Sequence, residues 1–127
     1  MSVEKLVITP EQMEEYRRGA REREARQRAA DDQRQQEARL AAQAAAQLLK
    51  EQYGATRVIL FGSLAHGAWF HARSDIDLAV AGIPAGSFWR AWCALDTLRV
   101  PFEINLVAIE EAPERLLASI RQEGINL

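Results

Sequence analysis

The spacing of apolar and polar residues divides the chain into two unlike parts. From Pro10 to about Tyr53 the sequence has one glycine, no further proline and a high content of Glu, Arg, Gln and Ala, all of which are compatible with an α-helix. Thr9 and Gln12 flank Pro10 in the order of a capping box, in which each side chain bonds the backbone N–H of the other residue. The pattern therefore predicts a helix that starts at Pro10 and, if continuous, is roughly 65 Å long.

The two ends of this predicted helix differ in apolar content. Residues 17–39 nearly lack large apolar side chains and their acids and bases balance, so we expect a solvated surface rather than a nucleic-acid-binding arm. A clean heptad pattern, which a strong coiled coil needs, is absent, while dimerisation through this helix stays open. Nearer its end we expect the helix to pack on the following domain, because apolar residues recur there at helical spacing: Leu40, Ala41, Ala44, Ala45, Leu48 and Leu49.

The second part of the chain alternates predicted strands and helices. Three runs, 56–61, 75–81 and 102–108, are rich in β-branched and other strand-forming residues. One helix is predicted from Ser87 to about Arg99 and another from Pro113 to Gly124. We therefore expect an α/β fold, a small sheet with helices against it, in a domain of residues 48–127 that follows a helical arm of residues 1–47.

Composition narrows the classes of function. The net charge of −2 provides no broad basic surface, so direct nucleic acid binding is not expected. The single cysteine, Cys93, excludes an internal disulfide and suits a reducing cytosol. No apolar run is long enough to cross a bilayer and the amino terminus lacks a signal-peptide pattern, so we expect a cytoplasmic protein with no membrane contact.

Two short motifs carry the candidate chemistry. The first predicted strand ends in Gly62-Ser63, and the second begins with Asp75-Ile76-Asp77. Side chains alternate along a strand, so the two aspartates face the same side. Adjacent carboxylates repel each other and favour a hard divalent cation between them, while free backbone amides of a Gly-Ser turn can bind phosphate. A metal ion beside a phosphate is the combination that nucleotidyl transfer requires.

Gly-Ser followed by Asp-x-Asp resembles the signature of the minimal nucleotidyltransferases of the DNA polymerase β superfamily. Eleven residues separate the two motifs here, one more than the usual spacing. The segments 104–113 and 120–127 are also similar to the end of these proteins, and the resemblance covers roughly Leu48 to the carboxyl terminus. It implies a small mixed sheet with flanking helices, preceded in this chain by a long N-terminal α-helix.

The resemblance also implies an activity and a partner. Asp75 and Asp77 would bind Mg²⁺ or Mn²⁺, which holds the triphosphate of ATP, and the implied nucleotide or phosphate contacts are Gly62, Ser63, His66 and Ser74. Proteins of this kind often act as antitoxins that transfer AMP to a HEPN-domain ribonuclease toxin. The resemblance therefore implies ATP as donor, a protein hydroxyl as acceptor and a HEPN-domain toxin as partner.

One departure from the family pattern affects the expected catalysis. The third carboxylate of these enzymes lies in a strand pattern such as Val-Asp-Leu-Val, and here the corresponding aspartate is replaced by Asn105. Asparagine carries no charge and cannot accept the proton of the attacking hydroxyl. Glu103 lies two residues earlier on the same predicted strand face, where it either replaces the missing carboxylate or is an exposed strand residue. Leu64 and His66 stand where related proteins frequently have arginine.

Two functions follow from these observations. The first is a metal-dependent nucleotidyltransferase that modifies a partner protein, which the intact pair of Asp75 and Asp77 favours. The second is a catalytically weak nucleotidyltransferase-fold module that neutralises its partner by complex formation, which Asn105 and the long helix favour.

Overall fold

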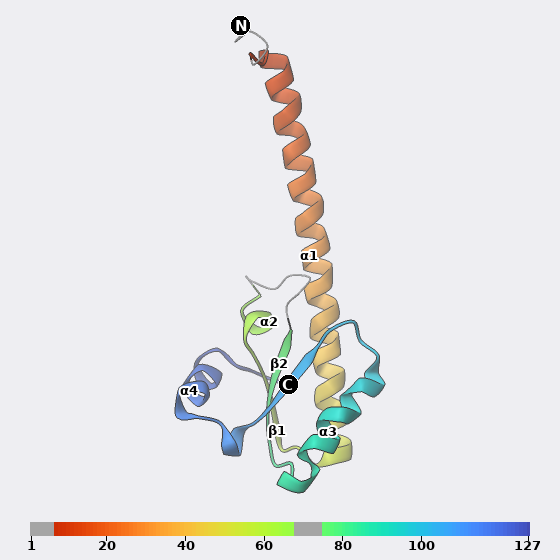
Figure 1. Cartoon of the computed structure of the whole chain (residues 1–127), viewed down its shortest axis with the longest axis vertical. Coiled ribbons are helices and arrows are strands. Elements are labelled where there is room, and N and C mark those ends of the chain that lie inside the picture. The colour runs from red at the N-terminus through yellow and green to blue at the C-terminus, as the bar shows by residue number, and fades with distance from the viewer. Residues whose placement is uncertain (1–6, 68–74) are drawn as a thin grey trace, which may run out of the picture. The chain divides into compact units, whose positions relative to one another are not determined.

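The structure, a computed structural model, describes residues 7–67 and 75–127 (Figure 1). The chain forms two compact units, residues 1–32 and residues 33–127. None of the described helices is long and apolar enough to span a lipid bilayer. The helices are α1 (Pro10–Tyr53), α2 (Ser63–His66), α3 (Phe88–Ala94) and α4 (Glu114–Glu123), and the strands are β1 (Arg57–Phe61), β2 (Ile76–Ala81), β3 (Ile104–Ala108) and β4 (Ile125–Asn126).

The first unit consists of the start of α1 and the residues that cap it. The capping box is confirmed, since Gln12 N–H donates to Thr9 Oγ1 at 3.1 Å and Thr9 N–H donates to Gln12 Oε1 at 3.0 Å. Most side chains of this segment are exposed, including that of Tyr16, and an exposed ion pair joins Arg21 to Glu14 at 3.3 Å. This part of α1 therefore has the solvated surface that its sequence predicts.

The second unit is built on a mixed four-stranded sheet with the order β3-β2-β1-β4. Strand β1 pairs antiparallel with β2 and with the two-residue strand β4, whereas β2 and β3 run parallel. The predicted α/β class, with helices against a small mixed sheet and a long N-terminal helix, is confirmed. The sequence did not indicate β4, because two residues are too few to show an alternating pattern.

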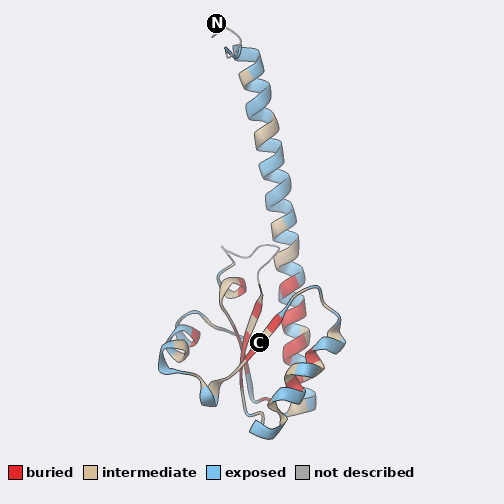
Figure 2. Cartoon of the chain, viewed as in Figure 1, coloured by how far each residue is buried: buried red, intermediate tan, exposed pale blue. Residues whose placement is uncertain are grey.

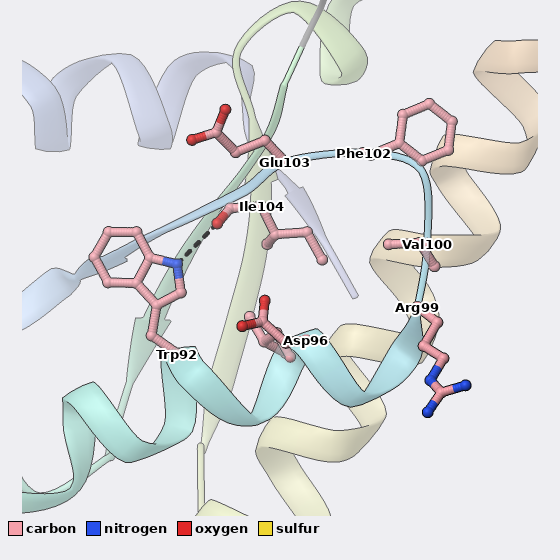
Figure 3. A pocket seen from close by; sticks show the side chains of 8 residues that line it. Trp92, Asp96, Arg99, Val100, Phe102, Glu103 and Ile104 are labelled. Atoms are coloured by element: carbon pink, nitrogen blue, oxygen red, sulfur yellow. Dashed lines mark hydrogen bonds between the residues drawn. The ribbon is translucent and has the colours of Figure 1, made fainter.

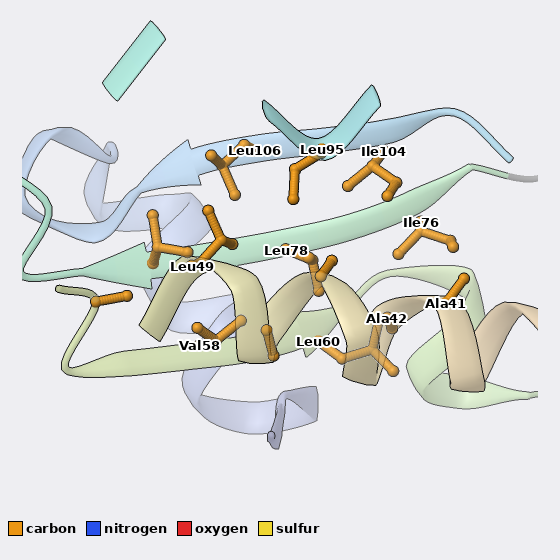
Figure 4. Close-up of a cluster of buried hydrophobic side chains, with 14 of the residues drawn as sticks. Ala41, Ala42, Leu49, Val58, Leu60, Ile76, Leu78, Leu95, Ile104 and Leu106 are labelled. Carbon is orange, nitrogen blue, oxygen red and sulfur yellow. The ribbon is translucent and has the colours of Figure 1, made fainter. Parts of the chain in front are cut away.

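The larger part of the hydrophobic core lies on the sheet face that α1 and α3 cover. Ala41, Ala42 and Leu49 from α1 lie beside apolar side chains of the strands (Figure 4). A smaller cluster on the other face joins Ile59 and Ala79 to Ile120 of α4. The sheet is therefore covered on both faces in the second unit, which makes an α/β/α arrangement.

The buried stripe of α1 differs from the predicted one. Leu40 was expected to pack on the domain, yet it is 66% exposed. Its position follows Ala38 by two residues, which places it about 200° around the helix from that buried residue. The predicted positions Ala41, Ala45 and Leu49 are buried, and most residues of the buried stripe are alanines: Ala38, Ala41, Ala42, Ala45, Ala46 and Leu49. Figure 2 shows buried residues along the part of α1 beside the sheet.

The predicted helix from Ser87 to Arg99 is divided into shorter pieces. A 3-10 turn, η2 (Ala85–Ser87), precedes α3, and a second one, η3 (Leu95–Leu98), follows it. Arg99 ends this segment in a left-handed conformation with φ 51°, the one positive φ of a non-glycine residue among the described residues. A third 3-10 turn, η4 (Ile109–Glu111), connects β3 to α4.

Candidate active site

The Gly-Ser turn directly follows β1 and lies against β2 at Asp77, one of the two candidate metal ligands. Gly62 has φ 77°, which favours glycine, and an added β-carbon there would overlap the carboxylate oxygen Oδ2 of Asp77. The pairing of Phe61 with Asp77 in the β1–β2 register brings the two together. Ser63 then begins the short helix α2. Glycine is thus required at position 62 by both the backbone conformation and the available space.

Asp75 immediately precedes β2 and Asp77 is the second residue of this strand; both are half-buried. Ile76 between them is fully buried in the core, so the alternation of side chains turns the two carboxylates toward the opposite face of the sheet. Burial raises the pKa of Asp77 above its ordinary value of 3.8, the hydrogen bond from Asn105 opposes this shift, and the charge of Asp75 adds to it. Two carboxylates this close repel each other, and a cation between them would offset the repulsion.

Asn105 of β3 bridges the two carboxylates. The parallel register places Asn105 opposite Asp77. Its amide nitrogen Nδ2 donates to Asp77 Oδ1 and to Asp75 Oδ2, each at 3.2 Å. A donor shared by two carboxylates partly offsets their repulsion. Sequence reasoning treated this residue as a missing acid and did not foresee that its amide would contact both aspartates.

The donors of the site fit a single hard cation. Two carboxylates, together with the carbonyl oxygen that Asn105 would present after rotation of its amide, form a set of oxygen ligands suited to Mg²⁺ or Mn²⁺. In residues 7–67 and 75–127, no three His, Cys, Asp or Glu side chains gather in an arrangement that could hold a metal ion. Glu103 precedes β3, its side chain is exposed, and its backbone oxygen accepts a hydrogen bond from Ile76 N–H. Its role as a replacement carboxylate stays a prediction.

His66 and Ser74 were predicted to contact the nucleotide or its phosphates. The Nε2 atom of His66 lies 2.8 Å from Oε2 of Glu123, so this side chain joins α2 to the end of α4. Ser74 lies outside the described residues. The phosphate contacts of Gly62, Ser63, His66 and Ser74 therefore stay predictions.

An arginine from α1 lies close to the end of α2. Gly67 has φ 76°, and a β-carbon there would overlap the Gln35 amide and lie 3.5 Å from Arg39 Nη2. Leu64, which occupies a position where related proteins frequently have arginine, is fully buried in the core. Sequence reasoning missed Arg39 because it precedes the turn by more than twenty positions and no motif links them.

A pocket of about 280 Å³ adjoins the start of β3 (Figure 3). Trp92 closes one side, where its indole N–H donates to the backbone oxygen of Ile104 at 2.8 Å. Glu103 also lines the pocket and is two residues from Asn105, so the pocket lies at the same end of β3 as the carboxylates. Its remaining lining residues are Leu95, Asp96, Arg99, Val100 and Phe102.

Comparisons with known proteins match the part of the chain that holds these residues. A family model described as polymerase beta, nucleotidyltransferase matches residues 43–127, which include the turn, both aspartates and Asn105. A search of curated proteins found no match.

Several solved toxin–antitoxin structures share the fold. One, a toxin–antitoxin with AMP-PNP, is 22% identical over 67% of this chain and 70% of that chain, with a TM-score of 0.56. The MntA–HepT toxin–antitoxin is 21% identical over 69% of each chain, with a TM-score of 0.52. A tri-AMPylated Shewanella oneidensis HEPN toxin in complex with MNT antitoxin gives 20% identity over 70% of each chain and a TM-score of 0.51.

Proposed function

Because the chain belongs to the polymerase beta nucleotidyltransferase family, we propose that it transfers AMP from ATP to a hydroxyl group of a HEPN-domain toxin and so acts as an antitoxin. The observation that carries the proposal is the placement of Asp75 and Asp77 on one face of β2, with the backbone of Gly62 against the second carboxylate. The similar folds of toxin–antitoxin complexes, one with AMP-PNP and one with a tri-AMPylated toxin, support the choice of partner and nucleotide.

The proposed roles follow from the chemistry of each group. Asp75 and Asp77 would hold Mg²⁺ or Mn²⁺. The cation would offset the negative charge of the triphosphate and the negative charge that develops on the leaving group. The backbone at Gly62 and Ser63 would orient the phosphates. Arg39, whose guanidinium lies near Gly67 at the end of α2, would be a source of positive charge. Each of these roles concerns binding and orientation, which is the main contribution of proteins to phosphoryl and nucleotidyl transfer.

The proposed reaction is a displacement at the α-phosphorus of ATP. The hydroxyl oxygen of the acceptor forms a bond to this phosphorus while the bond to the oxygen between the α- and β-phosphates breaks, and pyrophosphate leaves. The proton of the hydroxyl must pass to a base, and Asn105 cannot accept it. We assign this role to Glu103, whose side chain is exposed at the same end of β3.

The test is transfer of label from α-³²P ATP to the purified HEPN-domain partner in the presence of Mg²⁺. We expect a labelled toxin with the natural protein and an unlabelled one with Asp77→Asn. Absence of label with the natural protein, in a preparation that binds both ATP and the toxin, would refute the transferase activity.

The hydrogen bonds of Asn105 favour a second function, neutralisation by complex formation with little chemistry. An amide that donates to both carboxylates occupies the side from which a third acidic group would act in the enzymes of the family. This alternative predicts that Asp77→Asn protects against the toxin as well as the natural protein does. Loss of protection in that variant, with complex formation intact, would exclude it.

A further inference from the structure

The opposite end of the parallel strands carries a groove unrelated to the aspartate pair. Strand β2 ends at Ala81 and β3 ends at Ala108, and the segments that follow them border a cavity of about 460 Å³ together with α3. Ile83 and Phe88 form part of its apolar lining, and Glu110 and Glu111 of η4 are the acidic part. Nothing in the proposed transfer reaction uses this groove.

Trp89 provides the groove with a fixed and exposed aromatic surface. Its side chain is 69% exposed, an unusual position for an indole. The ring stacks on Trp92 with a centroid distance of 5.2 Å and an angle of 7°, and Phe88 lies edge-on to it at 6.0 Å. Trp92 is itself fixed by its hydrogen bond to Ile104. Trp89 is thus oriented before any ligand binds, which lowers the entropic cost of binding.

The two glutamates give the groove a negative charge that the described residues do not neutralise. Glu110 Oε2 accepts a hydrogen bond from Gly82 N–H at 2.8 Å, so this carboxylate is held in place while its other oxygen stays available. Neither Glu110 nor Glu111 takes part in any ion pair recorded within residues 7–67 and 75–127. Negative charge at the border of an aromatic surface repels phosphate groups and attracts a cation.

We propose that this groove binds an arginine-bearing segment of a partner protein. A guanidinium group can stack on the indole of Trp89 and at the same time donate a fork of hydrogen bonds to Glu110 or Glu111. The apolar lining from Ile83 and Phe88 suits the methylene groups of the arginine side chain. Tryptophan and arginine are also among the residue types that contribute most of the binding energy in protein interfaces.

The test is isothermal titration calorimetry of the full-length protein with a short oligo-arginine peptide. An oligo-citrulline peptide, which has nearly the same shape but no charge, serves as the reference ligand. We expect saturable binding of the arginine peptide and none of the citrulline peptide. Trp89→Ala should lower the affinity for the arginine peptide by roughly 3- to 30-fold, the scale of a cation–π contact. Glu110→Gln combined with Glu111→Gln should weaken binding similarly, although the glutamine oxygen can still accept the Gly82 N–H.

Two control variants separate the groove from the general charge of the protein. Tyr16→Ala removes another exposed aromatic ring, and Glu51→Gln removes another exposed carboxylate, so both should leave the affinity unchanged. Equal affinity in the natural protein and Trp89→Ala, or equal binding of the two peptides, overturns the proposal. So does a single-stranded oligonucleotide that binds the natural protein but not Trp89→Ala, because the occupant would then be a nucleic acid.

Discussion

The backbone of Gly62 lies directly against the carboxylate of Asp77. A methyl group at position 62 would overlap the Oδ2 atom of this aspartate. The absence of a side chain therefore sets how closely the Gly-Ser turn approaches the candidate metal ligand. If the turn binds phosphate and Asp77 binds the cation, this single contact fixes the spacing between the two parts of the nucleotide site.

Gly62→Ala should lower the free energy of unfolding by more than the positive φ of this position alone would cause. Gly54 offers a matched control, because its φ of 75° is nearly the same as the 77° of Gly62 but an added β-carbon would meet no atom within 4 Å. Gly54→Ala should cost about 1 kcal/mol of unfolding free energy from the positive φ. Gly62→Ala should cost about 1–3 kcal/mol more, from the overlap with Asp77. Equal losses in chemical denaturation would show that the close contact is unimportant.

Asp77→Asn should weaken the binding of ATP in the presence of Mg²⁺ without unfolding the chain. Asparagine has nearly the same shape as aspartate and still offers an oxygen to Asn105, but it lacks the charge that binds the cation. We expect a loss of more than about ten-fold in Mg²⁺-dependent ATP affinity, the lower limit for groups that support a metal site. Calorimetry that finds unchanged affinity would refute the assignment of Asp77 as a ligand.

The same variant should also reveal the electrostatic cost of the aspartate pair. The pKa of Asp77 is raised, chiefly by burial, so the folded chain holds this proton more tightly than the unfolded chain does. Protonated Asp77 therefore stabilises the folded chain below pH 3.8, its ordinary pKa. This stabilisation is lost as the pH rises through the raised pKa of the folded state. With a chelator at neutral pH, Asp77→Asn should melt at a higher temperature than the natural protein, and this difference should shrink as the pH falls toward 3.8. A constant difference would contradict the shift.

Asn105→Asp should make stability depend on a divalent cation. The substitution removes the donor that Asp75 and Asp77 share and adds a third carboxylate beside them. We expect a lower melting temperature in chelator and recovery with Mg²⁺. If Glu103 does not already accept the hydroxyl proton, AMP transfer to the toxin should also be faster by about 10- to 100-fold, the scale of general-base assistance or less. Asn105→Leu is the control, since it removes the donor without adding a ligand and should not recover with Mg²⁺.

The effect of Glu103 is linked to this result. If Glu103 already accepts the hydroxyl proton, Glu103→Ala should greatly reduce transfer and Asn105→Asp should increase it only slightly. Initial rates of label transfer for the two single variants and the double variant test this coupling. Unchanged rates in both single variants would show that neither Glu103 nor Asn105 marks the position of the third catalytic group.

The division into an arm of residues 1–47 and a domain of residues 48–127 stays a prediction that truncation can test. A chain that begins at Gln33 keeps the whole buried stripe of α1, so it should melt at nearly the same temperature as the full chain. A chain that begins at Ala42 lacks Ala38 and Ala41, which are 0% and 5% exposed, and should lose about 1–2 kcal/mol of unfolding free energy. A large loss already in the first chain would show that residues 1–32 stabilise the sheet domain.

Local sequence signals predicted those features that depend on a few neighbouring residues. The capping box of Thr9 and Gln12, the turn at Gly62 and the common face of Asp75 and Asp77 follow from backbone preferences and strand alternation. The hydrogen bonds of Asn105 could not be predicted, because they depend on how β2 and β3 pair in space.

Burial was harder to predict where alanine forms the contact. Alanine is compatible with both exposed and buried helix positions, so the pattern led to Leu40, the larger apolar residue, while Ala38 is the one in the core. The orientation of Trp89 likewise depends on stacking with Trp92 rather than on its own hydrophobicity.

Strand β2 also sets the distance between the aspartate pair and the groove of Trp89. Its six residues begin at the aspartate pair and end beside the groove of Trp89, so at about 3.3 Å per residue the two regions are roughly 20 Å apart. No single side chain bridges that distance. If the groove binds the partner that is modified, the partner must present its hydroxyl from a different part of its surface. Binding in the groove and AMP transfer would then be separate steps, so that a partner could be released after modification or bound without being modified.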